Sequence, residues 1–331
     1  MKLKSIVLLV CLMASASFAS VYPLASGNWS DAANWSKGVV PPDDGDEIKL
    51  LGSASDNAVS QDFVITVNSN VGNYSATKID TGRGSNLLVA TGGYIGNGRE
   101  MHIGDAGASG NGSDDGSLTI AGGTVDITGA GKLQIGYKAH VVDNPISGAR
   151  GGLVSITSGS LVGTAGRIYV ACSSADGSIG KLSVTGSAAT ISMGGEMYIA
   201  NDSASASGNT GQGTLEFNVV NGDVSRIQVL KTIIDSQNEE AAIATLLVSG
   251  TGSAPIADII LVENTGIDAV VGAFDNAGEG AQFNVGGVMM TLTYQYIAGV
   301  DGIANDIALV IPEPATLALL GLGLFAIRRK K

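Results

Sequence analysis

The chain has 331 residues, 48 of them glycine, while only 5% are aromatic and 15% are charged. This composition is too apolar for a disordered chain and too rich in glycine for a helical one, so short strands joined by tight turns are expected. The formal net charge is −12. Because six basic residues sit at the two ends of the chain, the body between them is more acidic still, which excludes nucleic acid as a partner.

The first 19 residues have the pattern of a secretory signal peptide. Lys2 and Lys4 precede an apolar run from Ser5 to Met13, and Ser17-Phe18-Ala19 forms a cleavage site of the small-residue type. An exported protein is therefore expected.

The two cysteines add little chemistry. Cys11 lies inside the apolar run of the signal peptide. A lipoprotein signal is the less favoured alternative, because Val10 stands where a small residue is needed. The mature chain then keeps only Cys172, which excludes an internal disulfide.

Glycine-bounded segments of alternating residues recur with a period of about 32 residues. Each unit begins with one alternating strand and ends with a second. The apolar pairs of the first strands are Leu87/Val89, Leu118/Ile120, Val154/Ile156, Leu182/Val184, Leu215/Phe217 and Leu246/Val248. The pairs of the second strands are Met101/Ile103, Leu133/Ile135, Ile168/Val170, Met197/Ile199, Ile227/Val229 and Ile259/Leu261.

Alternation with period 2 gives each strand one inward and one outward face. A unit of this size buries its inward face only by stacking on its neighbours, which is how solenoids are built. The prediction is an all-β fold, a right-handed parallel β-helix (β-solenoid) of about six rungs with an N-terminal cap and a C-terminal β-hairpin; a β-sandwich is the alternative. The expected organisation is a signal peptide (1–19), N-terminal cap strands (20–80), solenoid repeats (81–265), a C-terminal β cap (266–310) and a tail (311–331).

One segment breaks the repeat. Ser236 and Glu239 have the spacing of a helix capping box before an apolar run, which predicts a short inserted helix. The repeat register also places Leu246 and Val248 in a strand, so the helix has to end before them.

The outward residues of the second strands form two expected columns. They are Glu100, Lys132, Arg167, Glu196 and Arg226, and beside them His102, Gln134, Tyr169, Tyr198 and Gln228. Neighbouring rungs lie about 4.8 Å apart, so charges of opposite sign mostly meet, as on a solvated face. The sharper interpretation is a glycan-binding stripe of Tyr169, Tyr198, Gln134 and Arg167.

Neither column pairs carboxylates in the way that acid–base catalysis on a polysaccharide requires, so no catalytic residue and no enzyme is expected. The acidic turns 41–47 and 112–116 lack the spacing of a calcium loop, and the two histidines share no ligand spacing. No metal or cofactor is expected.

An N-terminal segment, Gly27 to Leu50, resembles the opening of many exported Gram-negative β-helix proteins. Trp29, Trp35, Pro41 and Asp46 match that opening. The glycine-bounded repeats resemble those of autotransporter-like passengers. The aromatic segment is expected to cover the open end of the solenoid and to block edge pairing.

The end of the chain, residues 274–331, resembles PEP-CTERM proteins. The matches are Glu279-Gly280-Ala281 and Gly286-Gly287 of a hairpin, Tyr294 of the following strand, and the signature Pro312-Glu313-Pro314. The acidic turn at 299–306 departs from the family by an insertion. An apolar run and the basic residues Arg328 and Arg329 follow the signature.

The resemblance implies recognition by an exosortase-type processing enzyme, with Pro312, Glu313, Pro314, Arg328 and Arg329 as the sorting residues. The apolar run spans 13 residues, 315–327, whereas a bilayer-spanning helix needs about 20. Transient contact with the inner membrane is therefore expected, with the basic end on the cytoplasmic side.

These features together predict a structural or adhesion protein exported to the cell surface or extracellular matrix of a Gram-negative-type bacterium, with exopolysaccharide as a candidate partner. A carbohydrate-binding adhesin that uses the outward solenoid face is the alternative. A polysaccharide lyase is the less favoured third.

Overall fold

The computed structural model describes residues 21–43, 47–50, 63–82, 84–105, 116–138, 151–172, 178–200, 211–234, 242–298 and 302–312. The predicted signal peptide, the tail from Glu313 onward and the segment Ser236–Glu239 lie outside these residues. Within the described part the fold is almost entirely β, with one 3-10 helix, η1 (Ala32–Asn34). That part holds no helix long and apolar enough to cross a membrane.

The strands stack on three faces. The first face holds β3 (Val64–Val67), β6 (Ser85–Ala90), the first halves of β9 (Gly116–Ile127) and β11 (Gly152–Gly163), β13 (Ile179–Thr185), β16 (Gln212–Val220) and β19 (Ile243–Thr251). The second holds β4 (Asn70–Tyr74), β7 (Tyr94–Asn97), the second halves of β9 and β11, β14 (Ala189–Met193), β17 (Ile227–Val229) and β20 (Ile259–Asn264). The third holds β2 (Glu47–Leu50), β5 (Lys78–Thr81), β8 (Glu100–Asp105), β10 (Lys132–Lys138), β12 (Arg167–Val170), β15 (Met197–Ile199) and β18 (Thr232–Ile234).

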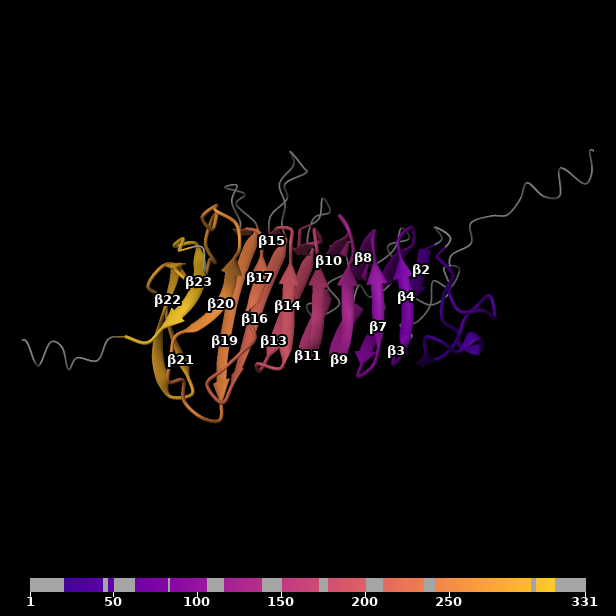
Figure 1. Ribbon diagram of the computed structural model, residues 1–331, viewed down its shortest axis with the longest axis horizontal. Coiled ribbons are helices and arrows are strands. Elements are labelled where there is room, and N and C mark those ends of the chain that lie inside the picture. Colours follow the sequence, from indigo (N-terminus) through magenta and orange to yellow (C-terminus); the bar gives the residue numbers. More distant parts are fainter. Residues whose placement is uncertain are drawn as a thin grey trace, which may run out of the picture.

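Every pairing between neighbouring turns of these faces is parallel. Figure 1 shows the turns following one another along the long axis in sequence order. The complete turns, each with strands on all three faces, are β3–β5, β6–β8, β9–β10, β11–β12, β13–β15 and β16–β18; β19 and β20 follow on the first two faces. This arrangement confirms the predicted parallel β-solenoid and excludes the β-sandwich, whereas its right-handedness stays a prediction. Parallel pairing already includes β3 and β5, so the stack begins before residue 81.

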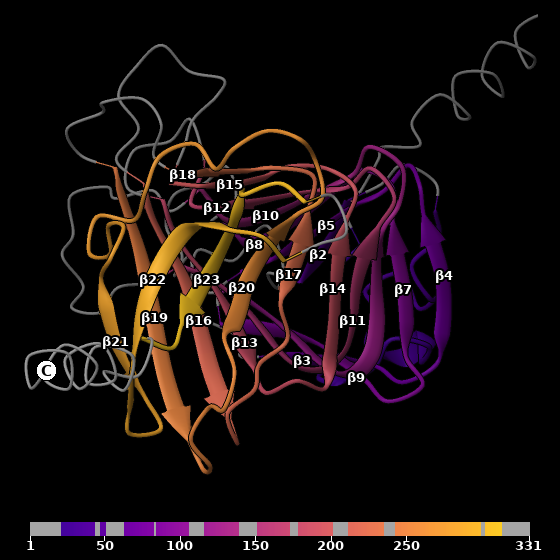
Figure 2. The ribbon, with the colours of Figure 1, turned by 60° about the vertical axis from the view of Figure 1, so that its left-hand side comes forward.

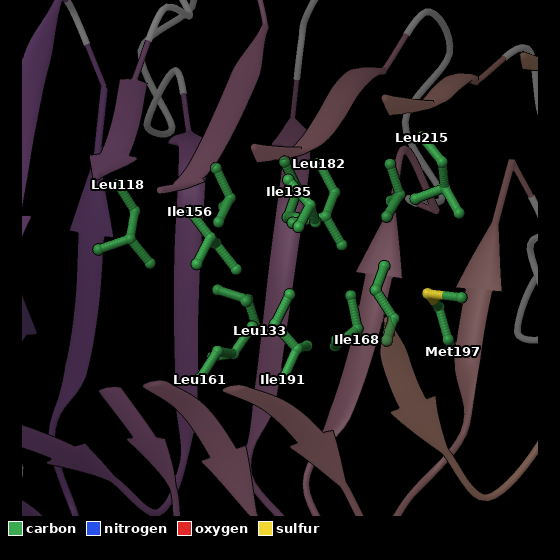
Figure 3. Close-up of a cluster of buried hydrophobic side chains, with 14 of the residues drawn as sticks. Leu118, Leu133, Ile135, Ile156, Leu161, Ile168, Leu182, Ile191, Met197 and Leu215 are labelled. Carbon is green, nitrogen blue, oxygen red and sulfur yellow. The ribbon is translucent and has the colours of Figure 1, made fainter. Parts of the chain in front are cut away.

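The strand register confirms the inward pairs predicted for the first face. Leu87, Leu118, Val154, Leu182, Leu215 and Leu246 form one column through the core. All six are almost fully buried. Figure 3 shows leucines and isoleucines from different faces meeting in the interior. Complete burial of each such side chain stabilises the fold by about 1.5–3 kcal/mol.

The predicted second strands of the fifth and sixth units were wrong. Ile227 and Val229 form β17, which pairs with β14, and Ile259 and Leu261 belong to β20, which pairs with β17; both strands lie on the second face. The third face continues instead through β18, five residues later, where Thr232 lies beside Met197. The stretch Ile227-Gln228-Val229 alternates apolar and polar residues, whereas Thr232-Ile233-Ile234 does not, so the pattern favoured the wrong stretch for the third face. Consequently Arg226 and Gln228 do not extend the column that contains Tyr198.

A single strand can bend across two faces because of a glycine at its corner. Gly159 of β11 has φ +86°, a conformation that side chains with a Cβ rarely adopt. A Cβ atom there would lie 2.2 Å from the carbonyl oxygen of Gly123 on the neighbouring turn. The twelve residues of β11 thus serve the first and second faces without a break.

An aromatic cluster covers the N-terminal end. The rings of Trp29 and Trp35 meet edge to face at 5.0 Å, and both are fully buried. Trp29 Nε1 donates to Tyr74 Oη at 2.9 Å, which in turn donates to the carbonyl of Pro41 at 3.1 Å. The short strand β1 (Gly27–Asn28) pairs with β3 beside this cluster. These contacts fit the capping role expected of the tryptophans.

Antiparallel strands close the other end. Figure 2, in which this end comes forward, shows β21 (Gln282–Val285), β22 (Val288–Tyr296) and β23 (Asp306–Val310) over the last turns. Gly286 and Gly287 link β21 to β22 with positive φ at both positions, as a two-residue hairpin requires. The predicted C-terminal hairpin is confirmed. The strand β23 lies between β22 and β20 and is antiparallel to both.

The edge of β19 is paired by side chains instead of another strand. Asn276 Oδ1 accepts from Leu246 N at 2.9 Å, and Asn276 Nδ2 donates to Leu246 O at 2.8 Å. Asp275 pairs with Ala244 in a similar way: its Oδ2 accepts from Ala244 N, and its main-chain N–H donates to Ala244 O. Two consecutive residues thus take the place of a further turn. Leu246 and Val248 lie in β19 as the repeat register predicted.

Candidate functional site

The described chain leaves the fold at a fixed point on the second face. Val310 pairs with Thr291 of β22 at the end of β23. The next residue, Ile311, donates its main-chain N–H to Asp258 Oδ1 at 2.9 Å. Tyr296 Oη holds the other oxygen of Asp258 at 3.1 Å. The backbone is therefore held through Ile311, and Pro312, the first residue of the predicted signature, is exposed.

A buried polar corner holds the beginning of β23. Asp306 is 1% exposed and accepts hydrogen bonds from Asn264 N at 2.8 Å and Ala298 N at 2.6 Å. Asn305 Nδ2 donates to the carbonyl of Gly266 at 2.6 Å. In the turn with the insertion, the pair Asn305-Asp306 thus has a structural task, which is to fix β23 to the loop after β20.

Of the five predicted sorting residues, only Pro312 belongs to the described part of the chain. Glu313, Pro314, Arg328 and Arg329 lie outside it. The structure therefore locates the point from which the sorting residues extend.

The four predicted glycan-binding residues lie together on the third face. Gln134, Tyr169 and Tyr198 occupy equivalent positions of β10, β12 and β15, and Arg167 lies next to Lys132. The rings of Tyr169 and Tyr198 stack on each other, with centroids 4.9 Å apart and planes 6° from parallel. Each ring therefore covers one face of the other, and their shared faces are closed to a sugar.

Two of these four residues are also nearly buried, since Tyr198 and Gln134 are each 8% exposed. Tyr198 Oη donates to Glu196 Oε2 at 2.6 Å. Burial, followed by this carboxylate, raises the pKa of Tyr198. Arg167 is more accessible and lies 3.5 Å from the same carboxylate. The two tyrosines predicted to offer open rings to a sugar thus stack on each other, and the charged groups of Arg167 and Glu196 lie beside them.

A second polar cluster on this face was missed from the sequence. His102 Nδ1 lies 2.9 Å from Asp80 Oδ1, and its Nε2 lies 3.5 Å from Glu100 Oε2. Lys78 Nζ approaches the same oxygen of Glu100 at 2.9 Å. The hydrogen bond from His102, with help from Lys78, lowers the pKa of Glu100 although burial opposes this.

This cluster was not predicted because the strand Lys78–Thr81 was assigned to the N-terminal cap and not to the repeats. Its alternation matches that of the strand beginning at Glu100, and the register places Asp80 beside His102. The side chains of Asp80 and His102 are 5% and 2% exposed. A polymeric substrate therefore has no access to this pair.

A polar groove crosses the second face between β14, β17 and β20. Its volume is about 410 Å³, and its lining includes Thr190, Asp223, Arg226, Gln228 and Asp258. Arg226 pairs with Glu263 at 2.7 Å, and Gln228 donates to the same carboxylate at 2.8 Å. Because Asp258 also holds Ile311, the groove borders the point where the chain leaves the fold.

Metal chemistry finds no support within the described ranges, where no three His, Cys, Asp or Glu side chains gather in a way that could hold an ion. The acidic turn at 41–47 contributes Asp43 to the fold instead. Its carboxylate accepts from the main-chain N–H groups of Ser75 and Ala76 at 2.9 Å each. Burial alone would raise the pKa of Asp43, but these hydrogen bonds bring it below its ordinary value.

The protein is therefore a parallel β-solenoid with a cap at each end, and a C-terminal tail follows the second cap. Residues 310–331 match the model of the PEP-CTERM protein-sorting motif. The chain thus carries this motif, as its end predicted, and the motif indicates export to the cell envelope or surface by exosortase-type sorting. No curated protein and no solved structure matches the chain.

Proposed function

We propose that this protein is a structural component of the cell surface or extracellular matrix, delivered there by an exosortase-type enzyme that processes its tail. The sorting motif at residues 310–331 carries the proposal. The solenoid supports it, because a stack with capped ends is a rigid, extended body that presents three outward faces. The expected setting is a Gram-negative-type envelope, with exopolysaccharide as the neighbouring polymer.

The proposed role is not enzymatic. The one described cluster that combines a histidine with carboxylates, Asp80, His102 and Glu100, lies with its His–Asp pair buried. Hydrolysis or elimination on a polysaccharide needs an acid and a base within reach of the sugar. The buried pair instead fits a structural task, which is to hold the neighbouring strands β5 and β8 together.

The test compares the full chain with a chain that ends at Ile311, both produced in a host that has the exosortase-type enzyme. The full chain is expected in the surface or matrix fraction, and the shortened chain is expected to be lost from it. The reversed pair Arg328→Glu and Arg329→Glu provides a finer variant with the same expected loss. Equal distribution of all three proteins between the cell fractions would contradict the proposal.

A second candidate function is carbohydrate binding at the ladder of Tyr169, Tyr198, Gln134 and Arg167. Its support is the register, which brings these side chains onto adjacent turns, and the partly exposed Arg167 at the rim. With the ring faces stacked, recognition there depends on hydrogen bonds from the phenol hydroxyl groups and from the guanidinium group of Arg167.

Glycan-array binding tests this second function. The double variant Tyr169→Ala and Tyr198→Ala is expected to lose at least tenfold in affinity, while Lys181→Ala on the first face is expected to bind normally. Unchanged binding by the double variant, or no binding by the wild type, removes this candidate.

A further inference from the structure

The last strand of the fold leads directly into the sorting motif. The matched motif begins at Val310, and this residue still belongs to β23. Ile307, Ala308 and Leu309 of the same strand are fully buried. One residue after the strand, Ile311 is held by Asp258, and the next residue is Pro312. No spacer separates the body from the signature.

An enzyme that binds its substrate as an extended chain pairs with the main-chain groups of that chain. The main-chain groups of β23 are not available for this, because β20 pairs with one edge and β22 with the other. Ile311 N is likewise engaged by Asp258 Oδ1. An enzyme reaches a bond within this segment only if the C-terminal cap opens first.

We propose that the folded cap sets the upstream limit of tail processing: the cut bond lies C-terminal to Ile311, and Asp258 holds the chain at that limit. The inference rests on the proposed function, since it assumes that an exosortase-type enzyme acts on the tail. Asp258 is a positioning residue here, because it touches the segment before the cut and not the reacting atoms.

The chemistry of the cut is ordinary acyl transfer. The carbon–nitrogen bond of one peptide group breaks, and its carbonyl carbon forms a new bond to the oxygen of water or to a nucleophilic acceptor group. The nitrogen of the released tail takes the proton that this nucleophile gives up. Atoms and electrons balance without an oxidant or reductant.

Mass spectrometry of the C-terminal peptide, on protein purified from the surface fraction, tests the limit. Every mature chain is expected to end at Ile311 or later. A mature end at Val310 or earlier overturns the inference while leaving the proposed function intact. A surface protein that still carries all 331 residues overturns the processing step of the proposed function, and the inference with it.

The role of Asp258 is tested with Asp258→Ala and the matched control Asp223→Ala. Asp223 lines the same groove, but its Oδ1 accepts from Val224 N and not from the segment before the tail. Asp258→Ala is expected to add a second population of mature chains that end upstream of Ile311, whereas Asp223→Ala keeps the wild-type ends. The same ends in both variants would remove Asp258 from the proposal.

Hydrogen exchange on the full-length, unprocessed chain gives an independent readout. The amide of Ile311 is expected to exchange at least tenfold faster in Asp258→Ala, with the amides of β17 unchanged. Tyr296→Phe removes only the hydroxyl that holds Asp258 Oδ2, so it is expected to give a smaller increase at Ile311 in a folded protein. Unchanged exchange at Ile311 in both variants contradicts the anchor.

Discussion

At the scale of single residues, the third face shows how polar side chains connect neighbouring turns. Glu100 contacts Lys78 on the preceding turn at 2.9 Å and Lys132 on the following turn at 3.6 Å, and it approaches His102 on its own strand. A carboxylate in this position joins three turns through one charge. Its pKa is lowered because the fold stabilises the ionised form.

This shift predicts a pH dependence for Glu100→Gln. The folded-state pKa lies below the ordinary value of 4.5, so the stabilisation is complete above pH 4.5 and is lost as the pH falls through the folded-state pKa. The variant is expected to be about 1–3 kcal/mol less stable than wild type at pH 7. That difference should shrink in acid, as followed by urea unfolding between pH 3 and pH 7.

Glu47→Gln is the matched control, because Glu47 lies on the same face in a more exposed pair with Lys49. Exposed pairs contribute about 0–1 kcal/mol, so this control should change little. A pH-independent difference for Glu100→Gln would contradict the assignment of the stabilisation to the carboxylate.

At the scale of elements, the alternation of the first-face strands was sufficient to predict their inward residues. Leu118, Val154 and Leu182 appear in the structure in the predicted register because a one-residue slip would turn them all outward. The second strands of the fifth and sixth units were misassigned. In the fifth unit Ile227-Gln228-Val229 alternates and Thr232-Ile233-Ile234 does not, yet the second of these stretches lies on the third face.

The candidate site was less predictable than the strands. Stacking brought Tyr169 beside Tyr198 as expected, but the exposure of a side chain depends on everything that covers it, and the pattern carries no such information. The anchor at Asp258 joins residues 53 positions apart across an antiparallel closure that the repeat does not contain. The same holds for Asn276, 30 positions from the strand that it pairs.

The side-chain pairing of β19 yields a prediction at this scale. Asn276→Ala removes the partners of Leu246 N and Leu246 O, and each main-chain group left unpaired away from water costs about 1–3 kcal/mol. The exposed edge also becomes a template for other chains. The variant is expected to melt at lower temperature and to form oligomers in light scattering.

Gln282→Ala, at an exposed position of β21, is the control for this variant and should stay monodisperse with the wild-type melting temperature. If Asn276→Ala behaved like this control, the edge of β19 would not depend on side-chain pairing.

At the scale of the whole molecule, stability in a stack is the sum of turns and of the interfaces between them. Such a body is weakest at its ends, where a turn has only one neighbour. The cluster of Trp29, Trp35 and Tyr74 addresses this at the N-terminal end with two buried indoles and a chain of hydrogen bonds.

Trp29→Ala is therefore expected to reduce the free energy of unfolding by about 3–5 kcal/mol. The loss should be local: hydrogen exchange is expected to accelerate in β3 and β6 while β16 and β17 keep their protection. Leu24→Ala, at a side chain that is 58% exposed, serves as the neutral control. Uniform acceleration along the whole stack would contradict the end-specific role.

The position of β23 has a consequence for the timing of secretion. Translocation delivers a chain from its N-terminus, so the aromatic cluster and the early turns can form while later turns are still crossing. The position of β23 between β20 and β22 cannot be filled until Val310 has crossed the membrane. The C-terminal cap can therefore close only after the whole folded body has been exported, which makes this cap the last part of the fold to form.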